Sequence, residues 1–114
     1  APALYIIEDL LNAGAEIIAY DPEGIENVRQ YFSYLPEHLK SKLNFASNYY
    51  EVLNGADFLA ILTEWTEFRT PDFSKVKSLL KEAIVFDGRN LYDLDTMKAE
   101  GFYYNSIGRK IIQH

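Results

Sequence analysis

The sequence predicts an α/β domain of three layers, with a mainly parallel sheet of about five strands. Three observations predict this fold class. Short apolar segments alternate with segments whose apolar residues recur at helical spacing, as in βαβ units. Residues 56–62 are nearly all apolar, as expected of a strand that is covered on both faces. No linker, repeat or low-complexity segment interrupts the 114 residues, so we expect one domain.

The chain opens with an expected helix and an expected strand. Residues 3–13 carry apolar side chains at helical spacing, Pro2 fits the first turn and Gly14 fits the stop. Residues 16–20 form a short apolar strand that Asp21-Pro22 ends. A doubly wound domain normally starts with its central strand, and the sequence also begins without Met. We therefore expect a piece of a longer protein whose first strand lies upstream.

The middle of the chain continues the alternation. Residues 23–33 present one apolar helical face, and the polar stretch 36–42 connects them to a weak strand at 43–46. Asn48 is a suitable N-cap for a short helix over 48–54.

The strand at 56–62 opens the second half, and four further elements follow it. Pro71-Asp72 begins a helix with Phe73, Val76, Leu79 and Leu80 on one side. The remaining expected elements are a strand at 83–86, a helix at 93–100 and a final strand at 102–104. Leu94 and Met97 are expected to face inward from this helix.

Composition excludes several classes of function. The net charge of −6 argues against nucleic acid as a main partner, because phosphate neutralisation needs basic patches. The absence of cysteine removes disulfides, thiolate metal sites and a cysteine nucleophile from this chain, and it is compatible with a cytoplasmic protein. No apolar run approaches the roughly 20 residues that span a membrane, so we expect no membrane partner.

The segment Asp87-Gly88-Arg89-Asn90 is the strongest candidate site. It follows the apolar run 83–86, and open α/β sheets bind ligands at the carboxyl ends of their strands. Gly88 allows unusual backbone conformations, and Arg89 carries a planar, permanently charged fork of donors suited to phosphate. Arg89 is predicted either to reach a ligand phosphate or a neighbouring subunit's site, or to form a surface ion pair.

Thr63-Glu64-Trp65 follows the other strong strand and supplies secondary candidates. Thr63 could donate to a phosphate or ribose, and Trp65 could stack on a base. The alternative is that Trp65 anchors the core and Glu64 is solvated, which is the commoner role of a lone Trp. Glu64 has no visible partner for work as a general base.

Other polar residues give weaker signals. Asp21 stands where an acidic residue binds ribose in dinucleotide folds, but no G-x-G-x-x-G precedes it, so a turn that caps a helix is favoured. His38 and His114 are isolated, with no metal-ligand spacing. No catalytic motif is visible, and we expect no metal.

Four separated motifs carry a resemblance to a known family. They are the segments 2–24, 55–73, 84–93 and 101–109, in that order. Together they resemble the C-terminal UDP-binding domain of the UDP-glucose/GDP-mannose dehydrogenase family, with the closest likeness to bacterial UDP-glucose 6-dehydrogenases. The likeness covers residues 1–109 of the chain, which is read as one Rossmann-like domain over 1–114.

The resemblance implies a function for this domain within a longer enzyme. Members of the family oxidise the C6 alcohol of a nucleotide sugar to a carboxylate in two NAD-dependent steps, and the full-length enzyme is expected to be a cytoplasmic homodimer. The family's Arg of the D-G-R motif, which helps to bind the UDP-sugar, falls on Arg89. The catalytic Cys, the dinucleotide fingerprint and the central first strand of this domain are implied to lie upstream, so this fragment is expected not to catalyse the reaction alone.

Two questions stay open at the level of sequence. The nucleotide sugar could be UDP-glucose, a UDP-N-acetylhexosamine or GDP-mannose, because the sugar pocket lies outside this chain. A rival of another class is a non-catalytic flavodoxin-like domain whose Tyr-rich surface binds protein. Without the first strand, the strands at 16–20 and 56–62 either pair directly or leave a gap that a partner chain fills.

Overall fold

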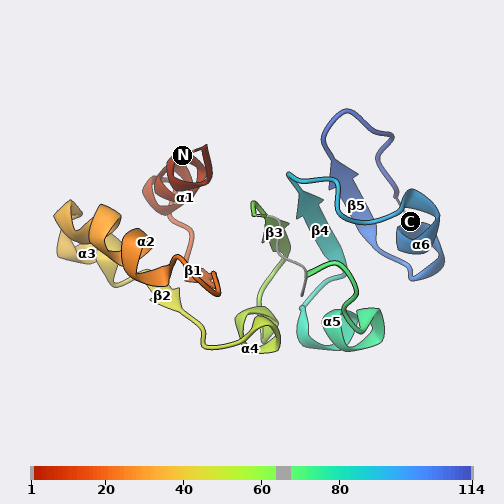
Figure 1. Ribbon diagram of the computed structural model, residues 1–114, viewed down its shortest axis with the longest axis horizontal. Coiled ribbons are helices and arrows are strands. Elements are labelled where there is room, and N and C mark those ends of the chain that lie inside the picture. Colours follow the sequence, from red (N-terminus) through yellow and green to blue (C-terminus); the bar gives the residue numbers. More distant parts are fainter. Residues whose placement is uncertain (1, 64–67, 114) are drawn as a thin grey trace. The chain divides into compact units, whose positions relative to one another are not determined.

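The computed structural model describes residues 2–63 and 68–113 (Figure 1). The chain divides into two compact units, Ala1–Val52 and Leu53–His114. Two of the secondary site candidates, Glu64 and Trp65, lie outside the described residues, as does His114.

The first unit holds a two-stranded parallel sheet with helices before and between its strands. Strand β1 pairs with strand β2 in the register Ile17↔Leu43. Leu11, Phe32, Leu35 and Leu43 form the buried core of this unit. Its elements are α1 (Pro2–Asn12), β1 (Ile17–Ala19), α2 (Ile25–Tyr31), the 3-10 turn η1 (Phe32–Tyr34), α3 (Glu37–Lys40) and β2 (Leu43–Phe45).

Helix α3 differs from the expectation from sequence, which is a polar connection over 36–42. Pro36 precedes its first turn, and the N–H groups of Leu39 and Lys40 donate to the Pro36 carbonyl at 3.0 Å. Leu39 is partly buried against the core of the first unit, whereas its neighbours Glu37, His38 and Lys40 are exposed. One apolar side chain in a single helical turn gives no periodicity, so the pattern could not reveal it.

The second unit holds a three-stranded parallel sheet in the order β3-β4-β5. The three arrowheads point to the same edge of the sheet (Figure 1). Helix α4 (Tyr49–Leu53) crosses the boundary between the units, and the other elements of the second unit are β3 (Leu59–Ile61), α5 (Phe73–Leu79), β4 (Ile84–Asp87), α6 (Leu94–Ala99) and β5 (Tyr103–Ser106).

The register of this sheet decides which side chains share a face. Asp87 pairs with Ile61 on one side and with Ser106 on the other, so the last residues of three strands lie in one row. All three side chains are buried, and Asp87 is only 2% exposed. Because side chains alternate along a strand, Phe86 points to the opposite face, where its ring lies 5.1 Å from that of Phe58.

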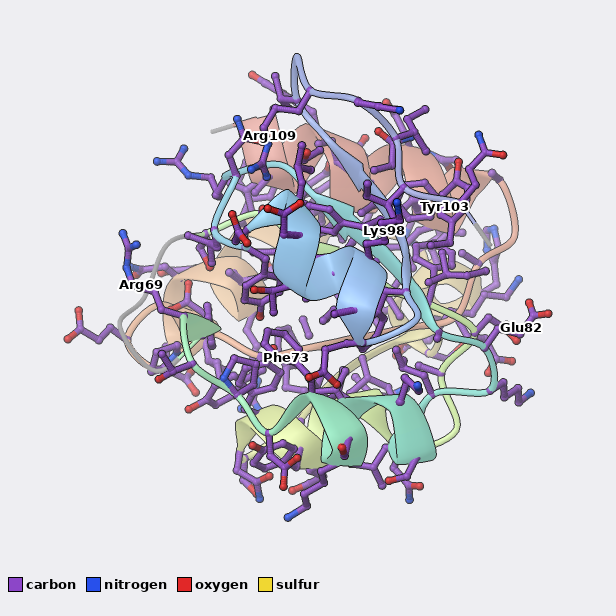
Figure 2. The ribbon with its side chains drawn as sticks, turned by 90° about the vertical axis from the view of Figure 1, so that its right-hand side faces the viewer. Arg69, Phe73, Glu82, Lys98, Tyr103 and Arg109 are labelled. Atoms are coloured by element: carbon purple, nitrogen blue, oxygen red, sulfur yellow. The ribbon has the colours of Figure 1, made fainter. Side chains whose placement is uncertain are left out.

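Helices α5 and α6 each place one fully buried side chain in the core of the second unit. Figure 2 shows Phe73 between these two helices, and its ring stands edge-on to those of Tyr92 and Phe102 at 5.1 and 6.0 Å. Val76 and Met97, which the helical spacing placed inward, are 2% and 0% exposed. The expected amphipathic helices are therefore confirmed.

The expected helix starts are confirmed by their hydrogen bonds. The carboxylate of Asp72 accepts from the N–H of Lys75 at 3.2 Å, and the side chain of Asn48 accepts from the N–H of Glu51 at 2.8 Å. Each cap satisfies a main-chain donor that has no partner within the helix.

The expected parallel α/β arrangement of five strands is confirmed, but the strands are divided between two sheets. In the described residues, β1 pairs with β2 alone and β3 pairs with β4 alone.

Candidate functional site at the carboxyl edge of the three-stranded sheet

The segment Asp87-Gly88-Arg89-Asn90 forms a turn directly after β4, at the edge where the three strands end. Arg89 and Asn90 are exposed, Gly88 is half-buried and Asp87 is buried. The turn therefore holds one cationic side chain at the surface and one anionic side chain inside.

The carboxylate of Asp87 organises this turn. Its Oδ1 accepts from the N–H of Arg89 at 2.8 Å, and its Oδ2 accepts from the N–H of Leu91 at 2.8 Å. Oδ2 also accepts from the hydroxyl of Tyr104 at 2.6 Å. A buried carboxylate is costly unless such donors satisfy it, so Asp87 fixes the backbone that carries Arg89.

Gly88 ties the same turn to the end of β3. Its N–H donates to the carbonyl of Ile61 at 2.8 Å. A Cβ added at this position would lie 3.1 Å from that carbonyl oxygen. Glycine is therefore required here because two backbone segments approach each other closely, and not because the residue has a left-handed conformation.

A second arginine, Arg109, lies at this end of the unit, where the strands finish (Figure 2). Its guanidinium donates through Nη2 to the Tyr104 hydroxyl at 2.7 Å and through Nη1 to the Tyr92 carbonyl at 2.9 Å. Its Nε donates to the hydroxyl of Ser106 at 2.9 Å. Three donors of the planar fork therefore hold the protein's own groups.

The hydroxyl of Tyr104 joins Arg109 to Asp87. Burial, followed by the hydrogen bond to Asp87 and the charge of that carboxylate, raises the pKa of Tyr104 to about 12. The hydroxyl consequently stays protonated at neutral pH and donates to Asp87 while it accepts from Arg109.

Two further contacts attach neighbouring segments to the turn. The side-chain amide of Asn90 donates to the carbonyl of Ile107 at 3.1 Å. The hydroxyl of Tyr92, two residues after the turn, donates to the carbonyl of Phe68 at 2.7 Å, in the chain that follows β3.

Tyr92, Tyr104 and Arg109 were not among the predicted site residues. A buried Tyr hydroxyl requires a partner, and Tyr104 lies two residues before the end of the last strand, so a hydrogen bond at this edge was foreseeable. Its partner Asp87 is 17 residues away in sequence and could be identified only from the strand register.

The other candidates are distributed over the chain. Thr63 is half-buried, two residues after β3. Asp21 accepts from the N–H groups of Glu23 and Gly24 at 3.0 and 2.8 Å, so it forms the expected turn. It does not cap the helix that follows, because α2 begins after Gly24 without a side-chain cap. His38 is exposed on α3.

The described residues show no metal site and no membrane span. No group of three or more His, Asp or Glu side chains in ranges 2–63 and 68–113 is arranged to hold a metal ion. None of the helices in these ranges has both the length and the apolar character needed to cross a membrane.

The turn is suited to binding an anion through a side chain. Several main-chain N–H groups of this segment already donate within the protein; they belong to residues 88, 89, 91 and 92. The guanidinium of Arg89 is exposed, and its planar set of donors and its positive charge suit a phosphate.

Comparison with known proteins gives a family match over most of the chain. Residues 1–94 match the UDP-glucose/GDP-mannose dehydrogenase family, UDP binding domain. Over 109 residues the chain is 42% identical to a UDP-glucose 6-dehydrogenase of Rhizobium meliloti, and over 113 residues it is 37% identical to the UDP-glucose 6-dehydrogenase TuaD of Bacillus subtilis. These alignments cover 96% and 99% of the chain but only 23% of either enzyme, so the chain spans about a quarter of the length of these relatives.

Solved structures support the fold. A UDP-D-ManNAc dehydrogenase from Pyrococcus horikoshii matches 94% of the chain with a TM-score of 0.54 at 18% identity, using 30% of its own chain. An NDP-N-acetyl-D-galactosaminuronic acid dehydrogenase from Methanosarcina mazei matches 96% with a TM-score of 0.56 at 19% identity, using 29% of its own chain. The chain therefore belongs to the UDP-glucose/GDP-mannose dehydrogenase family and corresponds to its UDP-binding domain.

Proposed function

We propose that this domain holds the UDP portion of UDP-glucose in an NAD-dependent UDP-glucose 6-dehydrogenase, and that Arg89 makes the charged contact. The observation that carries the proposal is the placement of an exposed guanidinium on a turn with internally bonded main-chain donors, at the carboxyl edge of a parallel sheet. A nucleoside diphosphate presents the oxygens that such a fork binds.

The relatives support UDP-glucose rather than another nucleotide sugar. Enzymes that are 42% and 37% identical over nearly the whole chain are named UDP-glucose 6-dehydrogenases. The two solved structures act on N-acetylated sugars by name, but at 18% and 19% identity they support the fold alone.

Oxidation itself is assigned to other parts of the protein. The six glycines of this chain contain no G-x-G spacing, so its residues do not fit the fingerprint that cradles a dinucleotide. We therefore derive no step of the reaction through NAD here, and we assign to this domain the binding and orientation of the substrate.

The test is Arg89→Ala and Arg89→Lys in the full-length enzyme. Loss of the planar fork removes a charge-assisted contact worth about 1.5–3 kcal/mol. We expect the KM for UDP-glucose to rise about tenfold to a hundredfold in the Ala variant, and less in the Lys variant, with the KM for NAD unchanged. Calorimetric titration with UDP should show the same loss of affinity.

A matched control uses Arg29, an exposed arginine of α2 paired with Glu26 at 3.2 Å. Arg29→Ala should leave both KM values unchanged. An unchanged KM for UDP-glucose in both Arg89 variants would refute the assignment. Turnover with UDP-glucose, UDP-N-acetylglucosamine and GDP-mannose decides the sugar, and an absence of UDP binding by the wild-type protein would favour a protein-interaction domain.

A further inference from the structure

We infer that Asp87, Tyr104 and Arg109 form a positioning network that holds the turn carrying Arg89 ready for the substrate. This inference rests on the proposed function of Arg89. In this network Arg109, the second arginine at this edge of the sheet, positions other residues of the protein and does not contact the ligand.

The network begins one hydrogen bond away from Arg89. Oδ1 of Asp87 accepts from the main-chain N–H of Arg89 itself at 2.8 Å. Oδ2 of the same carboxylate accepts from Leu91 at 2.8 Å, on the other side of the turn. One buried carboxylate therefore fixes the backbone immediately before and after the exposed guanidinium.

The carboxylate is held in turn by Tyr104. The Tyr104 hydroxyl lies 2.6 Å from Oδ2 of Asp87 and is completely buried, so water cannot replace it. Tyr104 sits on the neighbouring strand β5, where Asp87 pairs with Ser106, and the contact therefore follows from the sheet register.

Arg109 completes the network. It supplies a positive charge to the far side of the Tyr104 hydroxyl at 2.7 Å, and its guanidinium carbon stands 5.5 Å from the centre of the Tyr104 ring. Its bond of 2.9 Å to the Tyr92 carbonyl reaches the backbone two residues after the turn. The guanidinium of Arg109 therefore contacts both the Tyr104 hydroxyl and the Tyr92 carbonyl. Its positive charge opposes the charge of the buried Asp87 carboxylate, and its hydrogen bonds connect Tyr104 to the backbone at Tyr92.

The physical benefit is preorganisation. Binding a phosphate with a side chain on a loose turn would lose the ordering entropy of several residues at the moment of binding. With the turn ordered beforehand, fewer residues have to be ordered when the substrate binds. Loosening the network should therefore weaken UDP binding through Arg89 and leave the reaction chemistry unaffected.

The test measures whether Tyr104 and Arg109 act through Arg89. In the full-length enzyme we expect Tyr104→Phe and Arg109→Lys each to raise the KM for UDP-glucose and the dissociation constant of UDP about fivefold, the equivalent of one lost hydrogen bond. The kcat and the KM for NAD should not change. In an Arg89→Ala background the same substitutions should have no further effect on UDP affinity, because the group they position is gone.

A destabilised control separates positioning from general loss of stability. Val76→Ala creates a cavity in α5, where Val76 is 2% exposed, without touching the turn. It should lower the melting temperature at least as much as Tyr104→Phe while leaving UDP affinity unchanged.

The outcomes distinguish this inference from the proposed function. If Arg89→Ala leaves UDP affinity unchanged, the proposed function fails. If Arg89→Ala weakens UDP but Tyr104→Phe and Arg109→Lys do not, or if their effects are as large in the Arg89→Ala background, the positioning network is overturned and the proposed function stands. A loss of UDP affinity in Val76→Ala equal to that in Tyr104→Phe also overturns it.

Discussion

The side-chain amide of Asn90 lies 3.1 Å from the carbonyl oxygen of Ile107, and it joins the turn after β4 to the turn after β5. Asn90 also has a φ of 55°, in the left-handed region that side chains other than Asn and Asp rarely adopt. One residue thus closes the turn of Arg89 and connects it to the neighbouring strand end.

Substitution of Asn90 should separate these two contributions. Asn90→Ala loses the hydrogen bond of the side-chain amide and keeps an unfavourable φ, so we expect the free energy of unfolding to fall by about 2 kcal/mol. Asn90→Gly loses the bond but fits the φ, and should cost about 1 kcal/mol. Urea unfolding followed by circular dichroism measures both, and equal losses would show that the left-handed φ carries no penalty here.

Gly88 should not tolerate a side chain, because its Cβ would meet the Ile61 carbonyl oxygen at 3.1 Å. This oxygen belongs to the backbone of β3 and accepts the N–H of Gly88, so it cannot rotate away. We expect Gly88→Ala to lower the free energy of unfolding by about 1–3 kcal/mol, and Gly88→Val to lower it further. A Gly88→Val variant as stable as the wild type would contradict the close approach.

The sequence predicted the strands and most helices because their apolar residues repeat with a local period. The run 83–86 and the helix face of Val76 are examples; Val85 and Val76 are buried as expected, whereas Phe86 is exposed. Helix α3 escaped prediction because a single turn with one inward residue, Leu39, has no period to detect. The division of the strands into two sheets depends on pairing partners, which local patterns do not contain.

The candidate site was predicted only in its outline. The position of Arg89 at a strand end followed from an apolar run that stops at Asp87-Gly88. The internal role of Asp87, which was grouped with the substrate-binding residues, follows from contacts with Tyr104 and with the main chain. These contacts cross between strands, so only the register of β4 with β5 reveals them. Whether Asp87 or Gly88 touches the ligand stays a prediction.

The N-cap of α6 should contribute measurably to stability. The carboxylate of Asp93 accepts from the N–H of Thr96 at 3.1 Å and from its hydroxyl at 3.2 Å. Asp93→Ala removes the cap and should lower the free energy of unfolding by about 1 kcal/mol, whereas Asp93→Asn keeps an acceptor and should cost less. Urea unfolding of the two variants checks this order, and a reversed order would show that the carboxylate does not act as a cap.

Alkaline pH should weaken the fold through Tyr104. Its pKa is raised from 10.0 to about 12, first by burial and then by the bond to Asp87, so the folded state holds this proton more tightly than the unfolded state does. The resulting stability is fully present below pH 10 and is lost as the pH rises from 10 to 12, to a total of about 2 kcal/mol.

The check is the free energy of unfolding at pH 8 and at pH 11, compared between the wild type and Tyr104→Phe. The hydroxyl also donates to Asp87 at 2.6 Å, so the variant should be less stable at pH 8. The further fall in its free energy of unfolding at pH 11 should be smaller than that of the wild type, because the titrating group has been removed.

Tyr34 is the control, because its hydroxyl donates to Glu8 at 2.6 Å and its pKa is also raised to about 12, but its side chain is exposed. Solvent screens that pair, so Tyr34→Phe should decline with pH as the wild type does; an identical decline in Tyr104→Phe would show that the buried hydroxyl does not govern the alkaline transition.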